Sequence, residues 1–332
     1  MRDVSTSLYS GRHDAKTIKS LSSTVVETFK KQNLLLKNRA IYKKRNMKKV
    51  LSAFFALAVC LSLSAQGGKV FDNLTMKSKI LEMERNYAIY LPEDYDTSER
   101  SYPVLYLLHG MGDDHTGWIQ FGEVKHIADK AIAEGCATPM IIVMPDANTK
   151  YVGYFNHPNG EYNYENYFFD ELIPHIEKNY RCRTDKRYRA IAGLSMGGGG
   201  TLAFALHRPD LFAAACPLSA AVPQPDIDVI KTHYLKQVAD SPTIDFEAWY
   251  KQYDIFKLIQ EWPDENLAAV RWYIDCGDDD FLSDGNALLQ IELLKKKIPH
   301  QFRMRDGEHN WGYWRESLPE VLKFITVSFH QK

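Results

Sequence analysis

Two patterns of hydrophobic and polar positions alternate along the chain after residue 84. Short apolar runs bounded by turn residues are typical of buried strands, and apolar residues at three- and four-residue spacing are typical of amphipathic helices. Their alternation predicts an α/β fold with a doubly wound, mostly parallel sheet. The predicted strands cover residues 85–92, 102–110, 140–146, 188–195, 212–220, 270–277 and 300–306. The predicted helices cover residues 124–135, 166–180, 287–297 and 318–329.

The segment from Val222 to Asn266 interrupts this alternation. It is far longer than an ordinary connection between a strand and a helix, and insertions of such length commonly form lids or binding loops. Open α/β sheets bind ligands outside the carboxyl ends of their strands, so we expect residues 222–266 to lie there as a lid-like insertion. A surface insertion without a role in binding is the alternative.

The first 65 residues differ in composition from the rest. From Met47 the sequence reads MKKVLSAFFALAVCLSLSAQGGK, in which two lysines precede an apolar run and small residues follow it. This order is typical of a secretory signal peptide, and the run is shorter than the about 20 residues that a transmembrane helix needs. We predict a signal peptide at residues 47–65, a secreted or periplasmic protein without stable membrane insertion, and a non-native or mis-assigned extension at residues 1–46. An uncleaved signal anchor is the alternative.

Composition and charge indicate a folded domain and exclude several kinds of partner. The chain is 45% hydrophobic and 25% charged, so residues 66–332 hold enough apolar side chains for one folded domain. A formal net charge of -1 offers no basic surface to a nucleic acid partner. No cysteine has metal-ligand spacing, and aligning Asp280 and Asp284 with an EF-hand places Leu282 at a ligand position. We therefore expect no metal and no cofactor, and the oligomeric state is left open.

One serine stands among glycines where the strand at 188–195 meets a predicted helix. Gly193-Leu194-Ser195-Met196-Gly197 fits the pattern G-x-S-x-G, and its strand-turn-helix context is that of a nucleophile elbow. The glycines allow the tight turn, and the helix N-terminus favours a developing oxyanion. The stretch lacks the Lys-Ser/Thr of a phosphate loop and the G-x-G-x-x-G of a dinucleotide site. We predict Ser195 as the nucleophile.

A serine nucleophile needs a base and an acid, and in this kind of fold both follow it in the chain, the acid first. The strand at 270–277 ends in three carboxylates, Asp278, Asp279 and Asp280, and His309 follows the last strand. We expect His309 to take the Ser195 proton and one of the aspartates to fix the tautomer of the imidazole. An ordinary loop histidine and a solvated strand end are the alternatives.

An oxyanion needs two aimed N–H donors, one from the residue after the nucleophile and one from the loop after an earlier strand. We expect these donors to be Met196 and Met111, the second of which lies in LLHGMGDD. Gly110 and Gly112 let this loop approach the substrate. His109 and His115 are expected to shape the loop rather than to take part in the chemistry.

Five stretches together resemble the Putative esterase (esterase D-like) family, which is similar to carbohydrate esterase family 1: YPVLYLLHGMGDD, ENYFFDELIPHIEKNY, YRAIAGLSMGGGG, IDCGDDDFL and GEHNWGYW. The resemblance covers most of residues 80–330. It implies the α/β-hydrolase fold and ester hydrolysis through an acyl-enzyme intermediate. It also implies a triad of Ser195, His309 and Asp280, the acid lying three residues after Gly277, with Asp279 as the fallback.

The resemblance leaves the substrate open, since members of the family include feruloyl and acetylxylan esterases, S-formylglutathione hydrolases and siderophore esterases. The S-formylglutathione hydrolases are intracellular, so the predicted export favours removal of feruloyl or acetyl groups from plant polysaccharide such as xylan. Beside Gly110, we expect an aromatic wall for the substrate, with core packing as the alternative, from Trp118, Tyr154, Trp311, Tyr313 and Trp314. An inactive carbohydrate-binding member of the fold and a serine peptidase are further alternatives.

Overall fold

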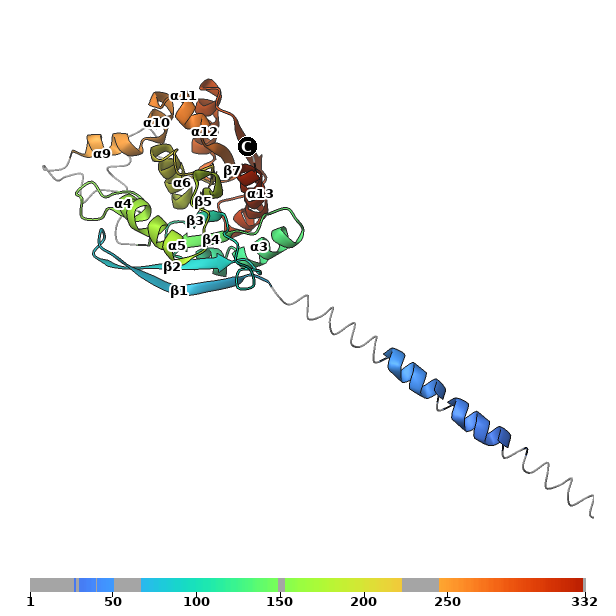
Figure 1. Ribbon diagram of the computed structural model, residues 1–332. Coiled ribbons are helices and arrows are strands. Elements are labelled where there is room, and N and C mark those ends of the chain that lie inside the picture. Colours follow the sequence, from blue (N-terminus) through green and yellow to red (C-terminus); the bar gives the residue numbers. More distant parts are fainter. Residues whose placement is uncertain are drawn as a thin grey trace, which may run out of the picture. The chain divides into compact units, whose positions relative to one another are not determined.

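The computed structural model in Figure 1 divides the chain into two units, Met1–Gln66 and Gly67–Lys332. The structure describes residue 27 and residues 30–39, 41–50, 67–148, 153–222 and 245–330. In the first unit, residues 30–39 and 41–50 are helical and exposed. Most of the predicted signal peptide lies outside the described residues, so it stays a prediction. Among the described residues, no helix is both long enough and apolar enough to span a membrane.

Eight strands form one sheet in the order β1-β2-β4-β3-β5-β6-β7-β8. β1 pairs with β2 and β2 with β4 in antiparallel fashion, and every other neighbouring pair is parallel. The predicted mostly parallel α/β sheet is therefore confirmed. The strands are β1 (Lys69–Ser78), β2 (Met83–Leu91), β3 (Val104–Leu108), β4 (Ile141–Pro145), β5 (Arg189–Leu194), β6 (Ala214–Leu218), β7 (Arg271–Gly277) and β8 (His300–Arg305).

Side chains of the central strands divide between two hydrophobic cores, one on each face of the sheet. In β3, Val104, Tyr106 and Leu108 belong to one core, and Leu105 and Leu107 belong to the other. Successive side chains of a strand point to opposite faces, so a strand that is covered on both faces must be apolar throughout. For this reason β3, β4 and β6, and β5 after Arg189, are visible in the sequence as apolar runs.

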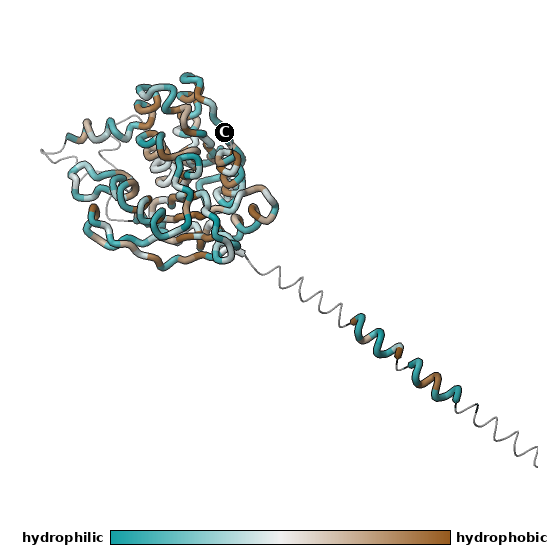
Figure 2. The backbone as a smooth tube through the Cα atoms, viewed as in Figure 1, coloured by the Kyte–Doolittle hydropathy of each residue, from teal (hydrophilic) through white to brown (hydrophobic). Residues whose placement is uncertain are grey.

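Helices supply the outer layers. α3 and α13 contribute to the core that contains Leu105, whereas α5, α6, α10 and α12 contribute to the core that contains Val104. Figure 2 shows polar and apolar stretches alternating along these elements. The helices are α2 (Gly117–Gln120), α3 (Val124–Ala133), α4 (Tyr164–Tyr167), α5 (Ile173–Asn179), α6 (Met196–His207), α9 (Phe246–Tyr253), α10 (Ile255–Glu261), α11 (Asp264–Ala268), α12 (Ser283–Lys295) and α13 (Trp311–His330), with a 3-10 turn at Lys186–Tyr188.

All seven predicted strands are present, but the sequence does not reveal β1. β1 is an edge strand whose residues are mostly exposed, so it lacks the apolar run by which the inner strands are recognised. The helix predicted at 166–180 is also more complex, because a π-helical turn, Phe168–Leu172, separates α4 from α5. Pro174 follows this turn, and its missing N–H and bulky ring are incompatible with regular α-helical hydrogen bonding at that point.

The insertion predicted at 222–266 is described only in its last part, since residues 223–244 lie outside the described residues. From Asp245 onward it is helical, and the side chains of Asp245 and Asp254 cap α9 and α10 by accepting hydrogen bonds from backbone N–H groups. Tyr253 and Ile259 are buried in the core. The described part is thus packed against the domain, and the lid stays a prediction.

Candidate active site

Ser195 lies between the last residue of β5 and the first residue of α6, in a backbone conformation that L-residues rarely adopt, with φ 53° and ψ -117°. The N–H of Ser195 donates to Leu218 O at 2.9 Å, which ties the turn to β6. A side chain at Gly193 would place its Cβ 2.5 Å from Gly197 O, so the turn closes only without one. Such a conformation costs of order 1–3 kcal/mol and is typical of functional sites.

The glycines after the turn allow α6 to pack closely against neighbouring backbone. A Cβ at Gly198 would lie 2.7 Å from Ala220 Cα, and one at Gly200 would lie 2.9 Å from the ring of Tyr154. Gly198 and Gly200 lie among the buried residues of α6. The glycine-rich stretch is therefore explained by close packing of the helix that follows Ser195.

The structure brings Ser195, His309 and Asp280 together from three separate segments. His309 Nε2 lies 3.0 Å from Ser195 Oγ, and His309 Nδ1 lies 2.8 Å from Asp280 Oδ2 and 3.0 Å from Asp280 Oδ1. Ser195 follows β5, Asp280 follows β7 and His309 follows β8, so all three lie at the carboxyl ends of parallel strands. Asp279 is exposed, and its carboxylate lies near those of Asp278 and Asp306 instead.

Asp280 is held in the charged form by its surroundings. Burial by itself raises the pKa of this carboxyl group, but hydrogen bonds from His309, from the Leu282 N–H and from the Ser219 hydroxyl outweigh it, so that the net shift of the pKa is downward. The Leu282 N–H donates to Oδ1 at 2.8 Å. Ser219 is itself fixed by the indole N–H of Trp314 at 3.0 Å. A buried carboxylate that is ionised at neutral pH can orient a histidine and stabilise its charged form.

Two aromatic rings hold the imidazole of His309. The ring of Trp314 is perpendicular to it, with centroids 4.9 Å apart, and the ring of Phe281 is tilted against it with centroids 4.5 Å apart. Trp314 is buried, whereas Phe281 is 77% exposed. The sequence alone does not indicate that Ser219 contacts Asp280 or that Phe281 contacts His309. Their positions in the sequence are the one indication of these contacts. Ser219 directly follows the end of β6, and Phe281 directly follows Asp280.

The two predicted oxyanion donors belong to segments that contain or approach Ser195. Met196 is the first residue of α6 and directly follows Ser195. Gly110 lies beside Ser195, because a Cβ at Gly110 would be 3.6 Å from the Ser195 Cβ. Met111 follows Gly110, and its side chain is exposed. Met196 is thus adjacent to the serine in the chain and Met111 is adjacent to Gly110, and their role as the two N–H donors of an oxyanion hole stays a prediction.

The predicted aromatic wall is wrong for four of its five members. Trp118 and Tyr154 are almost fully buried; the Trp118 indole N–H donates to Leu108 O and the Tyr154 hydroxyl donates to His109 O. Tyr313 and Trp314 are buried as well. The large apolar surface and single polar atom of each ring suit a buried position with one hydrogen bond. The bonds of Tyr313 and Trp314 go to the side chains of Asp275 and Ser219. Trp311, the fifth member, is partly exposed and packs edge-on against Trp118.

The carboxylates of Asp278, Asp279 and Asp306 form the one group of potential metal ligands among the described residues, with their oxygen atoms within 4.8 Å of one another. All three residues are exposed. Exposed carboxylates are normally hydrated and commonly cluster without binding a metal ion. This group is therefore not assigned as a metal centre.

Comparison with known proteins identifies relatives among the esterases. The family model described as Putative esterase matches residues 78–325. A solved ferulic acid esterase is 38% identical, has a TM-score of 0.71 and aligns with 79% of this chain and 99% of its own. A solved S-formylglutathione hydrolase from Agrobacterium tumefaciens is 21% identical, with a TM-score of 0.63 over 80% of this chain and 97% of its own. The endo-1,4-beta-xylanase/feruloyl esterase of Xylanibacter ruminicola is 38% identical over 147 residues, which are 42% of this chain but only 20% of that relative.

Proposed function

The chain belongs to the Putative esterase family and is a carboxylic ester hydrolase, and we propose that Ser195, His309 and Asp280 are its catalytic triad. The observation that carries this proposal is the continuous series of hydrogen-bond contacts from Ser195 Oγ through His309 to the Asp280 carboxylate. A nucleophile, a base within hydrogen-bond reach of it and an acid that orients the base are the three parts that acyl transfer to serine requires.

In the first half of the reaction, Ser195 Oγ attacks the carbonyl carbon of the ester while His309 Nε2 takes the hydroxyl proton. The carbonyl oxygen becomes an oxyanion, which accepts hydrogen bonds from the N–H groups of Met111 and Met196. The tetrahedral intermediate then collapses. The bond between the carbonyl carbon and the alcohol oxygen breaks, His309 gives its proton to that oxygen, and the acyl group stays on Ser195.

In the second half, water replaces the alcohol. His309 Nε2 takes a proton from the water as its oxygen attacks the acyl carbon, and the same N–H groups hold the oxyanion. When this intermediate collapses, His309 returns the proton to Ser195 Oγ and the carboxylic acid leaves. The Asp280 carboxylate stabilises the imidazolium of His309 in both halves.

We propose that the substrates are feruloyl or acetyl esters of plant polysaccharide, such as those on xylan. Support comes from the 38% identity to a ferulic acid esterase over 79% of this chain, and from the relative in Xylanibacter ruminicola, whose name joins an endo-1,4-beta-xylanase with a feruloyl esterase. A signal peptide at residues 47–65 would place the enzyme outside the cytoplasm with such polymers. An S-formylglutathione hydrolase is the competing assignment, at lower sequence identity.

Rates of hydrolysis of methyl ferulate, acetylated xylan and S-formylglutathione by the purified protein and by Ser195→Ala test both proposals. We expect turnover of at least one of the first two substrates, and a loss of about 10³-fold or more in the variant. Retained turnover in Ser195→Ala would contradict the triad. A strong preference for S-formylglutathione would contradict the polysaccharide substrate. N-terminal sequencing of exported protein tests the signal peptide, and a first residue before Met47 would contradict it.

A further inference from the structure

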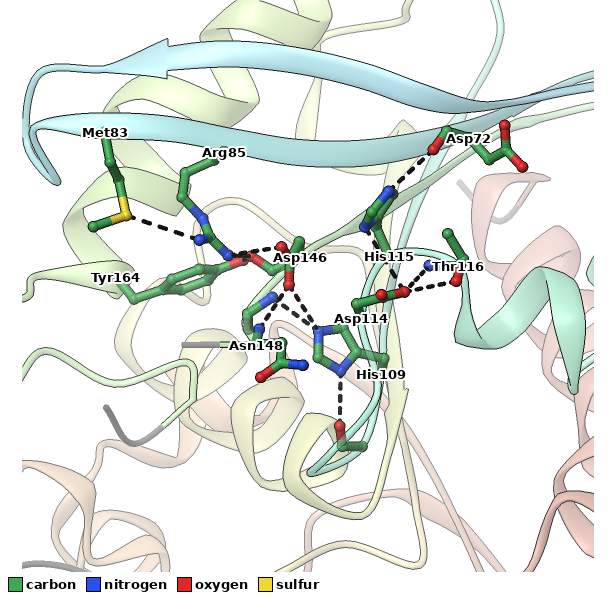
Figure 3. Close-up of polar contacts among 12 residues, drawn as sticks. Asp72, Met83, Arg85, His109, Asp114, His115, Thr116, Asp146, Asn148 and Tyr164 are labelled. Carbon is green, nitrogen blue, oxygen red and sulfur yellow. Dashed lines mark hydrogen bonds and ion pairs between the residues drawn. The ribbon is translucent and has the colours of Figure 1, made fainter. Parts of the chain in front are cut away.

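His109 is a buried histidine beside the candidate site whose tautomer can be read from its neighbours. The N–H of Ala147 donates to His109 Nε2 at 2.8 Å, so Nε2 must be an acceptor without a proton. The proton of the neutral ring is therefore on Nδ1, which donates to Gly110 O at 2.7 Å. Burial lowers the pKa of His109, in keeping with a neutral ring. Figure 3 shows the imidazole between these two contacts.

The contact with Gly110 O fixes a peptide unit that matters for the oxyanion. Gly110 O and the N–H of Met111 belong to the same peptide plane, and in a trans peptide they point in opposite directions. No cis peptide bond occurs in the described part of the chain. When His109 holds Gly110 O on its own side, the Met111 N–H is directed to the opposite side. Gly110 lies beside Ser195, so this orientation decides whether the N–H is available to the oxyanion.

A second peptide plane fixes His109 itself. Asp146 O accepts hydrogen bonds from Arg85 at 2.6 Å and from the Tyr164 hydroxyl at 2.9 Å. The N–H of Ala147 belongs to the same peptide unit and points the other way, toward His109 Nε2. The Arg85 guanidinium also pairs with the Asp146 carboxylate at 3.1 Å, and both side chains are buried. Figure 3 shows Arg85 and Tyr164 on one side of Asp146 and His109 on the other.

We propose that His109 is a positioning residue that links two peptide planes and thereby directs the Met111 N–H at the oxyanion. The order of contacts is Arg85 and Tyr164 to Asp146 O, Ala147 N–H to His109 Nε2, and His109 Nδ1–H to Gly110 O. The inference rests on the proposed function, because it assigns a role in the same reaction. His109 touches neither the serine hydroxyl nor the reacting carbonyl in this scheme, and it acts through the backbone alone.

Two substitutions separate the two hydrogen bonds of His109. Asparagine can place an amide N–H near the position of Nδ1 and so keep the contact with Gly110 O, but it cannot reach Ala147. Glutamine can place an amide oxygen near the position of Nε2 and so keep the contact with Ala147 N, but it has no donor near Nδ1. Both side chains are neutral and polar, so each is a control for the other. We expect His109→Gln to lower kcat on methyl ferulate at least tenfold more than His109→Asn, with similar KM values, since the oxyanion forms only in the transition state.

Equal losses of kcat in the two variants, or a larger loss in His109→Asn, would overturn the proposal. Tyr164→Phe is an independent variant in case both changes at His109 prevent folding. It removes one hydrogen bond to Asp146 O and should lower kcat several-fold with KM unchanged. An unchanged kcat would contradict the proposal that the peptide between Asp146 and Ala147 holds His109 in place. Ser195→Ala is measured alongside. If that variant is as active as the wild type, the proposed function fails. If Ser195→Ala is inactive but His109→Asn loses more kcat than His109→Gln, only the positioning role of His109 is refuted.

Discussion

Replacement of Asp280 by asparagine should inactivate the enzyme by selecting the wrong histidine tautomer. The Leu282 N–H donates to Asp280 Oδ1 at 2.8 Å, so an asparagine keeps that bond only with its carbonyl oxygen at this position. Its NH₂ group then takes the place of Oδ2, 2.8 Å from His309 Nδ1. An amide N–H directed at Nδ1 requires that nitrogen to be an acceptor, which moves the imidazole proton to Nε2. A protonated Nε2 cannot take the proton of Ser195.

The expected loss is large. In serine proteases with the same arrangement, the aspartate-to-asparagine change lowers kcat about 10⁴-fold, which is about 5 kcal/mol of transition-state stabilisation. The assay is the hydrolysis of methyl ferulate near pH 7 by wild type and Asp280→Asn. Asp279→Asn is the matched control, because it makes the same change at the adjacent exposed carboxylate. An Asp280→Asn variant with more than about a tenth of wild-type kcat, or an Asp279→Asn variant that loses as much, would refute the assignment.

Two further predictions concern stability. Ser195→Gly should abolish activity but raise the free energy of unfolding by about 1 kcal/mol over the wild type, since glycine adopts φ 53° without strain. Ser195→Ala keeps the strained side chain, so a lower melting temperature in Ser195→Gly than in Ser195→Ala would contradict this. His207 donates from Nδ1 to the Glu165 carboxylate and from Nε2 to Gln252 O, both at 2.6 Å, so both nitrogens carry protons. Burial by itself lowers the pKa of His207, but the bonds to Glu165 and Gln252 outweigh it and raise the pKa overall. The stabilisation is complete below the unfolded pKa of about 6.5 and is lost as the pH rises through the folded pKa. Urea unfolding between about pH 6 and 9 should therefore show a steeper loss of stability in the wild type than in His207→Gln, and parallel slopes would contradict this.

Sequence patterns predict those parts of the fold and the site that depend on one side chain or on one continuous run of residues. Apolar runs identify β3 to β6. The glycines around Ser195 identify a turn that larger residues do not permit. In the sequence, only the family resemblance favours Asp280 over Asp279 as the triad acid. The structure adds its physical basis, since Asp280 is buried against His309 and Asp279 is exposed.

Other features depend on contacts between distant segments and could not be predicted. Tyr154 looks like a candidate substrate contact in the sequence, but its ring occupies the space left by Gly200, which lies 46 positions later. Arg85 lies in a strand with polar neighbours and gives no local sign that it is buried against Asp146. The role of an aromatic or charged residue near a motif is therefore decided by packing, which neither periodicity nor composition encodes.

The outer strands of the sheet bear on how the protein behaves at high concentration. β1 and β8 are the two edges, and they present the exposed side chains of Lys69, Lys77 and Arg303. An unpaired edge is a template for strands from other copies of a chain, but a strand that docked there would have to bury these charges. A shift of register between Phe71 and Leu74 further interrupts the regular edge of β1. Among the described strands, both edges of the sheet thus carry charges that disfavour pairing with strands from further copies.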